Sequence, residues 1–261
     1  MTTAKIAYVQ WPEHLLPHGA TWDLICRTVD AADADILITN EMPFGVWLAE
    51  SPAFDADRAQ RSIELHEEAL DALRGLNVGA VVSSRPVAVG DRLANEAFVL
   101  EGAQYRAIHH KQYFPQEKGF FEQAWFVAQQ KGFECVRIGA VRVGVMLCTE
   151  LYFNEHARHY GRLGADLIVT PRASGTSHHY WKAAGAMAAI VSGAYWISSN
   201  RHGPAEHGQV FGGAGLAMSP EGVLSGQTTD DANLMVATID LDLTRQQKSQ
   251  YPCYVAELPR V

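Results

Sequence analysis

The N-terminal part of the chain alternates between short apolar runs and longer stretches in which apolar side chains recur at helical spacing. Residues 5–10 and 35–41 have the apolar, β-branched character of buried strands, and residues 22–34 between them carry apolar side chains at intervals typical of a helix. A second amphipathic stretch, 57–75, ends at a glycine and is followed by another apolar run, 77–84. This order predicts β-α-β units whose helices cover the strands.

The middle of the chain changes to short strands separated by brief turns. We predict strands at residues 95–102, 104–111, 124–130, 133–139 and 141–147. The alternation of helix and strand then returns, with helices at 154–163 and 180–194 and strands at 165–171 and 195–200. Two further strands, 212–220 and 234–241, flank a turn. Residues 243–261 show no strong period and are predicted to form an irregular tail.

Nothing in the sequence divides the chain into parts. It has no linker rich in Gly, Ser or Pro, no internal repeat and no low-complexity segment. We therefore expect a single domain over residues 1–261, of the α/β class, with mixed sheets inside and helices outside. The 48% share of hydrophobic residues is ample for the core of such a domain.

The charge of the chain narrows the class of partner. The formal net charge is −8 at pH 7, and Lys and Arg nowhere form a block. These features do not suit nucleic acid or an anionic membrane surface, so a small molecule is the expected partner. The N-terminal residues do not have the layout of a secretory signal, and no apolar run is long enough to cross a bilayer. We therefore expect a cytoplasmic protein.

The four cysteines, Cys26, Cys135, Cys148 and Cys253, are widely scattered. Their spacing argues against a disulfide framework and against a zinc site, so each is expected to be a free thiol. Cys148 differs from the others because it directly follows an apolar strand and is itself followed by polar and aromatic side chains. This position makes it the cysteine to consider for chemistry.

Three of the predicted strands end at an ionisable side chain: Glu41, Lys111 and Cys148. The ends of strands in α/β sheets are where side chains project into a crevice. A thiol becomes a strong nucleophile only when it is deprotonated, which requires a base within hydrogen-bond reach and is helped by a cation. Glu41 and Lys111 supply that pair. The spacing alone is equally compatible with a structural ion pair beside a cysteine that only fills the core.

Over nearly its whole length, the chain resembles the nitrilase superfamily of carbon-nitrogen hydrolases. The segment ADADILITNEMPFG is similar to the one that contains the family's first glutamate, and YRAIHHKQYFPQEKGFFEQAWF is similar to its lysine segment. The family's cysteine segment corresponds to VRVGVMLCTELYFNEHARHYGRLGADLIVTPRASG. The stretches WISSNRHG and GGAGLAMSPEGV follow in the expected order. An ordered set of motifs is far more specific than any one of them.

The resemblance implies a role for each matching position. Glu41 corresponds to the general base that later acts as general acid, Lys111 to the cation that stabilises the oxyanion, and Cys148 to the nucleophile. Glu122 corresponds to a second glutamate that holds the lysine and helps to position the substrate, although Glu117 lies close by and could take that role. Water would then split the thioester formed on the cysteine, and this chemistry calls for no metal or organic cofactor.

Residues around the expected site indicate which class of substrate it would bind. Thr149 follows the cysteine where nitrile-cleaving members commonly have tryptophan; its backbone N–H can still donate to the oxyanion, but the pocket wall must differ. Nitrile hydrolysis is therefore not the first choice. Arg172 lies at the end of a predicted strand. It is either a surface residue or a residue whose planar guanidinium binds a substrate carboxylate. Aromatic candidates for the pocket wall, which could equally belong to the core, are Trp47, Tyr113, Phe114 and Tyr152.

Two histidine pairs could suggest a metal site. These pairs are His156 with His159 and His178 with His179, and neither has a supporting pattern of carboxylates. We therefore expect solvated or capping histidines and no metal site.

The resemblance implies a four-layer α-β-β-α sandwich of the nitrilase type and a homodimer formed through helices beside the site. The favoured function is cysteine-dependent hydrolysis of a small amide or N-carbamoyl compound. A nitrilase, or a non-catalytic binding or regulatory member of the same fold, is the alternative. The sequence leaves open whether water or another amine resolves the thioester.

Overall fold

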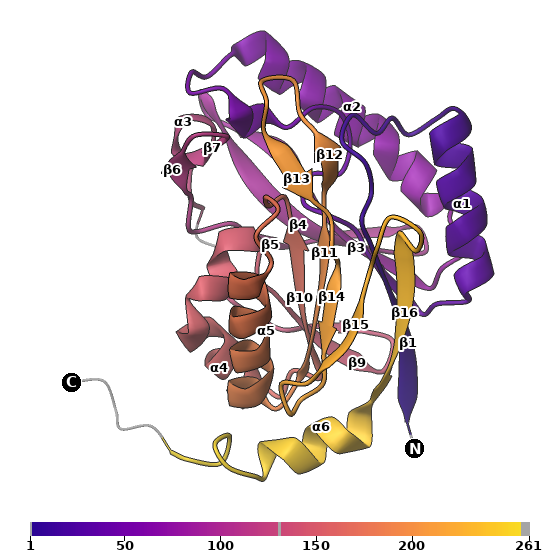
Figure 1. The fold of residues 1–261 in the computed structure, drawn as a ribbon, viewed down its shortest axis with the longest axis vertical. Helices are drawn as coiled ribbons and strands as arrows, with labels where there is room; N and C mark the ends of the chain where they lie inside the picture. Colours follow the sequence, from indigo (N-terminus) through magenta and orange to yellow (C-terminus); the bar gives the residue numbers. More distant parts are fainter. Residues whose placement is uncertain (1, 130–131, 257–261) are drawn as a thin grey trace.

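Two six-stranded sheets lie face to face in the computed structural model, which describes residues 2–129 and 132–256 (Figure 1). The first sheet has the order β16-β1-β2-β3-β4-β5, formed by Leu234–Asp240, Thr3–Val9, Ile36–Ile38, Ala80–Val89, Arg92–Glu101 and Gln104–His110. The second has the order β15-β14-β11-β10-β9-β8, formed by Leu224–Gln227, Leu216–Met218, Tyr195–Asn200, Leu167–Arg172, Val141–Val145 and Val136–Ile138. The neighbouring strands β1, β2 and β3 are parallel, as are β9, β10 and β11.

Helices cover the outer face of each sheet (Figure 1). Helices α1 (Ala20–Ala32) and α2 (Ala56–Arg74) pack on the first sheet, and α4 (Asn154–Arg162) and α5 (His179–Ser192) pack on the second. The predicted four-layer α-β-β-α sandwich is therefore confirmed. The remaining elements are α3 (Glu122–Trp125), α6 (Leu241–Lys248), the 3₁₀ turns η1 (Leu48–Glu50) and η2 (Cys148–Tyr152), and the hairpins of β6 (Gln116–Glu117) with β7 (Phe120–Phe121) and β12 (His202–Pro204) with β13 (Val210–Gly212).

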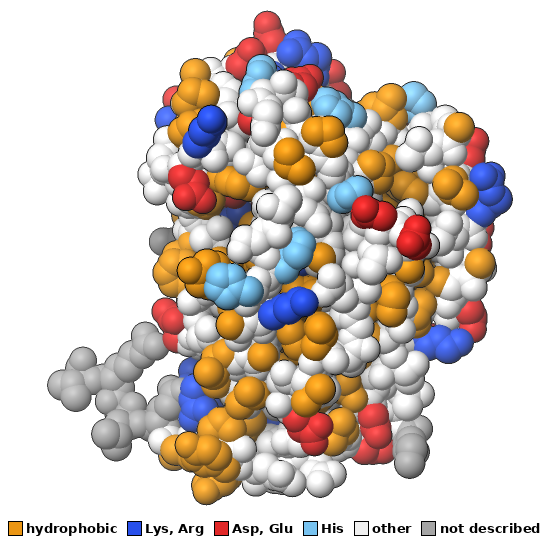
Figure 2. All heavy atoms as spheres, viewed as in Figure 1, with side chains coloured by type: hydrophobic (Ala, Val, Ile, Leu, Met, Phe, Trp, Pro, Cys, Tyr) orange, Lys and Arg blue, Asp and Glu red, His pale blue; other side chains and the backbone are white. Residues whose placement is uncertain are grey.

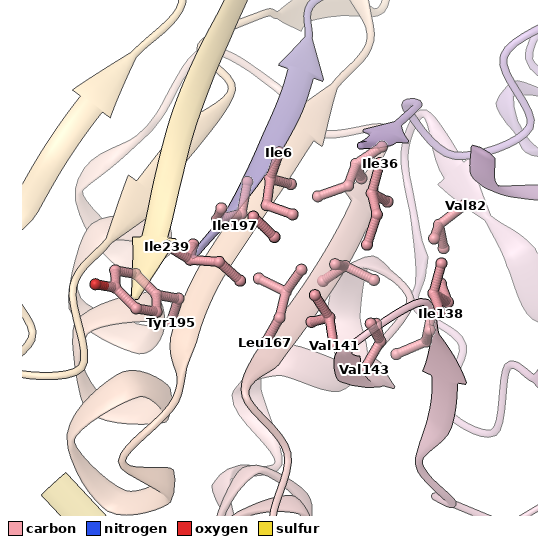
Figure 3. Close-up of a cluster of buried hydrophobic side chains, with 14 of the residues drawn as sticks. Ile6, Ile36, Val82, Ile138, Val141, Val143, Leu167, Tyr195, Ile197 and Ile239 are labelled. Atoms are coloured by element: carbon pink, nitrogen blue, oxygen red, sulfur yellow. The ribbon is translucent and has the colours of Figure 1, made fainter. Parts of the chain in front are cut away.

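Alternation along the strands explains why the central runs are apolar throughout. In β1, Ile6 and Tyr8 join the core between the sheets, whereas Ala7 and Val9 join the core under α1 and α2. Figure 3 shows side chains of both sheets, among them Ile6 and Leu167, meeting in the central core. A strand that is buried on both faces has no polar face, which is why the sequence pattern of these strands is continuous.

The strand predicted at 124–130 is wrong for the residues that the structure describes. The helical turn α3 ends at Trp125, and Phe126 makes only an isolated bridge to Leu93. The backbone N–H groups of Glu122 and Phe126 donate to Pro115 and Glu122, respectively, which closes a local turn in place of a strand. Residue 130 lies outside the described residues.

The irregular tail predicted for 243–261 is also partly wrong. Helix α6 occupies Leu241–Lys248, and the Asp240 side chain caps its start by accepting from the Asp242 N–H at 2.9 Å. Only Leu241 and Thr244 of this helix are buried, so its apolar stripe is too weak to reveal a helix by periodicity. Residues 257–261 lie outside the described part of the chain.

Candidate active site

Glu41 lies just beyond the carboxyl end of β2, where the chain leaves the first sheet. Its side chain is fully buried, and Oε1 accepts hydrogen bonds from Asn95 Nδ2 at 2.7 Å and from Lys111 Nζ at 2.8 Å. Its backbone N–H donates to the carbonyl of Arg172, at the end of β10, at 3.2 Å. This bond joins one strand end of each sheet, so Glu41 sits where the two sheets meet.

Lys111 follows the last residue of β5 and is fully buried. Its backbone N–H donates to the carbonyl of Asn95 at 2.9 Å, which fixes the end of the strand. The ammonium group lies 2.8 Å from Glu41 Oε1 and 2.6 Å from Glu122 Oε2. The structure therefore brings Glu122 to the lysine, whereas Glu117 is exposed on β6.

One ammonium cannot neutralise two buried carboxylates, and the pKa values reflect this. Burial raises the pKa of Glu122 to about 8; the negative charge of Glu41 also raises it, whereas Lys111 opposes the rise. Burial disfavours the charged form of Lys111, but Glu122 and Glu41 outweigh this effect and hold the lysine pKa above its ordinary value. The ammonium therefore stays charged, and Glu122 carries a proton near neutral pH.

Cys148 begins the turn η2, shortly after the end of β9. Its backbone φ of 48° lies in the left-handed region, which costs a residue other than glycine on the order of 1–3 kcal/mol. The thiol is almost completely buried and points to the carbonyl oxygen of Ala173 at 3.9 Å. Burial raises its pKa well above the usual range, the charge of Glu41 raises it further, and Lys111 opposes the rise. The resting thiol is therefore protonated and needs a base.

Cys148 and Glu122 line a pocket with a volume of about 510 Å³. Its aromatic wall consists of Phe120, Tyr152, Tyr180 and Trp181, and polar groups are supplied by Thr149, Ser174 and Gln209. Among the described residues that line the pocket, the carboxyl side chains are Glu117 and Glu122, and none is Lys, Arg or His. A volume of this size suits a small organic molecule.

Two of the predicted wall residues, Thr149 and Tyr152, line this pocket. Trp47 instead lies behind it: the buried indole packs against Phe120 at 6.4 Å between ring centroids. Tyr113 is also placed elsewhere, stacked on Phe153 at 3.7 Å. Both residues support the structure around the pocket and do not form its lining.

Arg172 is fully buried and does not line the pocket. Its Nε donates to Ser198 Oγ at 2.5 Å, one terminal nitrogen donates to Ser174 Oγ at 2.9 Å, and the other donates to the carbonyl of Ala214 at 2.8 Å. The guanidinium also lies 4.7 Å from the centroid of the Trp181 ring. Arg172 therefore holds two residues of the pocket wall, Ser174 and Trp181, from behind.

Several residues of the site were not singled out from the sequence. Asn95 is a fully buried amide in β4, but this strand also contains Arg92, Glu96 and Glu101, so the sequence alone does not mark Asn95. Tyr180, Trp181 and Gln209 come from a helix and a loop far along the chain, and no local pattern marks them. Across residues 2–129 and 132–256, no group of His, Cys, Asp and Glu side chains could hold a metal ion.

The sequence model of the carbon-nitrogen hydrolase family matches residues 64–249, well over half of the chain. The chain belongs to this family. The match begins in α2 and ends beside α6, so it includes the strand ends that carry the lysine and the cysteine. Lys111 and Cys148 thus lie inside the matched segment, while Glu41 lies before it.

Known proteins similar to this chain include a nitrilase and several amidases. A nitrilase from Pyrococcus abyssi (strain GE5 / Orsay) is 34% identical over 164 residues, which cover 61% of this chain and 58% of the nitrilase. An (R)-stereoselective amidase from Pseudomonas sp is 26% identical over 230 residues, which cover 85% of this chain and 78% of the amidase. The matched part thus spans less than two thirds of the nitrilase.

A solved structure supports the same fold. The crystal structure of a carbon-nitrogen hydrolase from Helicobacter pylori G27 matches with a TM-score of 0.85 at 18% sequence identity, covering 97% of this chain and 94% of that one. At this identity the match establishes the architecture of the chain and not its substrate. No helix in the described ranges is both long and apolar enough to cross a membrane.

Proposed function

We propose that this carbon-nitrogen hydrolase cleaves a C–N bond in a small amide or N-carbamoyl compound through a thioester on Cys148. One observation carries the proposal: a buried ammonium, Lys111, is held between the carboxyl groups of Glu41 and Glu122 within electrostatic reach of a thiol that lines a pocket. A structural ion pair would not need a buried cysteine in a left-handed turn at the pocket wall.

The first half of the reaction forms the thioester. Glu41 accepts the proton of the Cys148 thiol as sulfur bonds to the substrate carbonyl carbon. The oxygen becomes an anion, which the Lys111 ammonium and the backbone N–H of Thr149 stabilise. When the C–N bond breaks, the nitrogen takes the proton held by Glu41 and leaves as ammonia or an amine.

The second half releases the acid. Glu41 accepts a proton from water, and the resulting hydroxide attacks the thioester carbonyl. The C–S bond breaks, the proton returns to sulfur, and the acid departs. Glu122, paired with Lys111, keeps the ammonium in place for both oxyanions. Each proton is thus returned within one cycle, and the residues alone complete the reaction.

The lining of the pocket favours a substrate without a negative charge. A substrate carboxylate would meet the negative charge of Glu117 there, and none of the described lining residues is a Lys, Arg or His that could pair with it. The contacts of the Arg172 guanidinium to Ser198, Ser174 and Ala214 give no support to the expectation that it binds a substrate carboxylate. We therefore propose an uncharged or cationic amide.

A nitrile is the second candidate substrate because the nitrilase of Pyrococcus abyssi is among the relatives. A panel of small amides, N-carbamoyl amines and nitriles, assayed for released ammonia, distinguishes these classes. We expect turnover of an amide or carbamoyl compound and a loss of at least about a thousandfold in Cys148→Ala. The matched control is Cys135→Ala, a half-buried thiol outside the pocket, which should keep its activity.

Two outcomes would contradict the proposal. Activity that survives Cys148→Ala would exclude the cysteine as nucleophile. The second outcome has two parts: no compound of the panel is hydrolysed, and Cys148 reacts with iodoacetamide no faster than Cys135. This result would indicate a non-catalytic binding or regulatory protein.

We also propose a cytoplasmic homodimer. Apolar side chains on and beside α5, including Tyr180 and Met187, are exposed, as are Tyr251 and Tyr254 after α6. Such residues are suited to an interface between copies of the chain. On the face shown in Figure 2, acidic and basic side chains are interspersed, without a field of one sign. Sedimentation that gives a monomer at assay concentrations would remove the dimer.

A further inference from the structure

Glu150 is a fully buried carboxylate that the proposed reaction does not use. It lies in η2, two residues after the cysteine, and its Oε2 accepts from the backbone N–H of Leu147 at 2.7 Å. Leu147 is the residue immediately before Cys148. One oxygen of Glu150 therefore fixes the backbone from which the thiol projects, in the manner of a side chain that caps a turn.

The same carboxylate reaches the strand end that carries the lysine. Glu150 Oε1 accepts from the backbone N–H of Gln112 at 2.7 Å, and Oε2 lies 2.8 Å from His109 Nε2, which donates to it. Gln112 follows Lys111 directly, and His109 precedes it by two residues in β5. Glu150 thus contacts the chain on both sides of the lysine.

Through these contacts, the carboxyl group of Glu150 connects the two sheets. The lysine segment extends from β5 of the first sheet, and the cysteine turn follows β9 of the second. Charge-assisted hydrogen bonds at these distances are short and directional, and burial strengthens them. The strained φ of Cys148 also requires surrounding contacts that hold it.

We propose that Glu150 is a positioning residue that sets the thiol of Cys148 relative to the ammonium of Lys111. The inference rests on the proposed function of these two groups. Glu150 touches neither the reacting atoms nor the pocket, since it is absent from the described pocket lining. It acts through the backbone of Leu147 and Gln112, whose positions determine how the nucleophile and the oxyanion stabiliser face the same carbonyl.

The variant Glu150→Gln tests the proposal with little change in volume. Both carboxylate oxygens face N–H donors, so the amide nitrogen that this variant introduces would face one of them and push the two segments apart. A misplacement of about 1 Å can lower the rate about a hundredfold. We expect kcat to fall at least about tenfold, KM to change less than about threefold, and alkylation of Cys148 by iodoacetamide to slow by a similar factor.

The matched control is Asp166→Asn, at the opposite end of β10. Asp166 also accepts from a backbone N–H, that of Arg142, at 3.0 Å, and from the Thr244 hydroxyl at 2.8 Å. Its loss should lower the melting temperature while kcat and the alkylation rate stay unchanged. Loss of kcat in both variants in proportion to their loss of stability would overturn the proposal, because the effect of Glu150 would then be only structural.

A second variant keeps the proposal testable if Glu150→Gln does not fold. His109→Phe keeps a ring that can pack on Phe133 but removes the donor to Glu150 Oε2. We expect a smaller fall in kcat and in alkylation rate, about two- to fivefold. Unchanged values in a folded His109→Phe together with unchanged values in Glu150→Gln would refute the positioning role. The alkylation rate tests this role even if no substrate is turned over, so failure of the proposed function is recognised separately.

Discussion

The carboxyl group of Glu122 should make the stability of the protein depend on pH. Burial raises the pKa of Glu122 from its ordinary value of 4.5 to about 8 in the folded protein, and the negative charge of Glu41 adds to the rise. Between these two pH values the folded state binds a proton that the unfolded state has lost. The free energy of unfolding therefore falls as pH rises from about 4.5 to about 8, by at most about 1.4 kcal/mol for each pH unit.

Glu122→Gln removes this titration while keeping the shape of the side chain. Summed over the interval, the contribution of Glu122 is on the order of 5 kcal/mol, undiminished by solvent because the group is fully buried. In the variant the amide oxygen can still accept from the Lys111 ammonium, and Lys111 keeps Glu41 as a partner at 2.8 Å. We therefore expect little change in stability near pH 5 and a variant that becomes more stable than the wild type as pH approaches 8.

Urea denaturation of both proteins at pH 5, 6, 7 and 8 measures the difference. Glu117→Gln is the control, because Glu117 lines the same pocket but is exposed. The difference between Glu122→Gln and wild type should widen with pH, whereas Glu117→Gln should follow the wild type throughout. Parallel curves for Glu122→Gln and the wild type would refute the reasoning that Glu122 is held protonated.

Two further substitutions test the packing around the site. Arg172→Met removes the buried guanidinium and its three hydrogen bonds, so thermal unfolding should show a loss of about 2–4 kcal/mol. The KM ratio of anionic to neutral amides should stay constant in that variant; a selective rise for anionic amides would instead establish carboxylate binding. In Gly185→Ala the new methyl carbon would lie 2.3 Å from the Trp196 ring, and we expect a loss of about 1–3 kcal/mol in the same assay. Gly132→Ala should leave the melting temperature unchanged, because no heavy atom of the described residues lies within 4 Å of the carbon that it adds.

The sequence predicts those parts of the fold that have a strong local pattern. Strands such as β1 and helices such as α2 are continuous or periodic in apolar residues, so their positions follow from the chain alone. The turn α3 and helix α6 have no such stripe. Trp125 and Phe126 are buried by contacts with distant residues, and α6 begins at its Asp240 cap and buries only Leu241 and Thr244. Periodicity does not carry this information.

The same distinction applies to the site. Glu41, Lys111 and Cys148 follow strand ends, and strand ends can be located from the sequence. The aromatic wall of the pocket depends on which rings face the cavity and which lie behind them. Phe120 covers Trp47, and this order is set by how two loops pack in space. The role of Glu150 likewise becomes visible only when β5 and β9 are seen to end side by side.

The reactive groups come from different sheets: Glu41 and Lys111 extend from the first and Cys148 from the second. During refolding, either sheet can form its own hydrogen bonds while the cysteine still lacks both its base and its cation. Turnover during refolding should therefore begin only at the step in which the sheets dock. The appearance of activity would therefore report when the two sheets come together. An isolated half of the chain would carry either the thiol or the carboxylate, and never both.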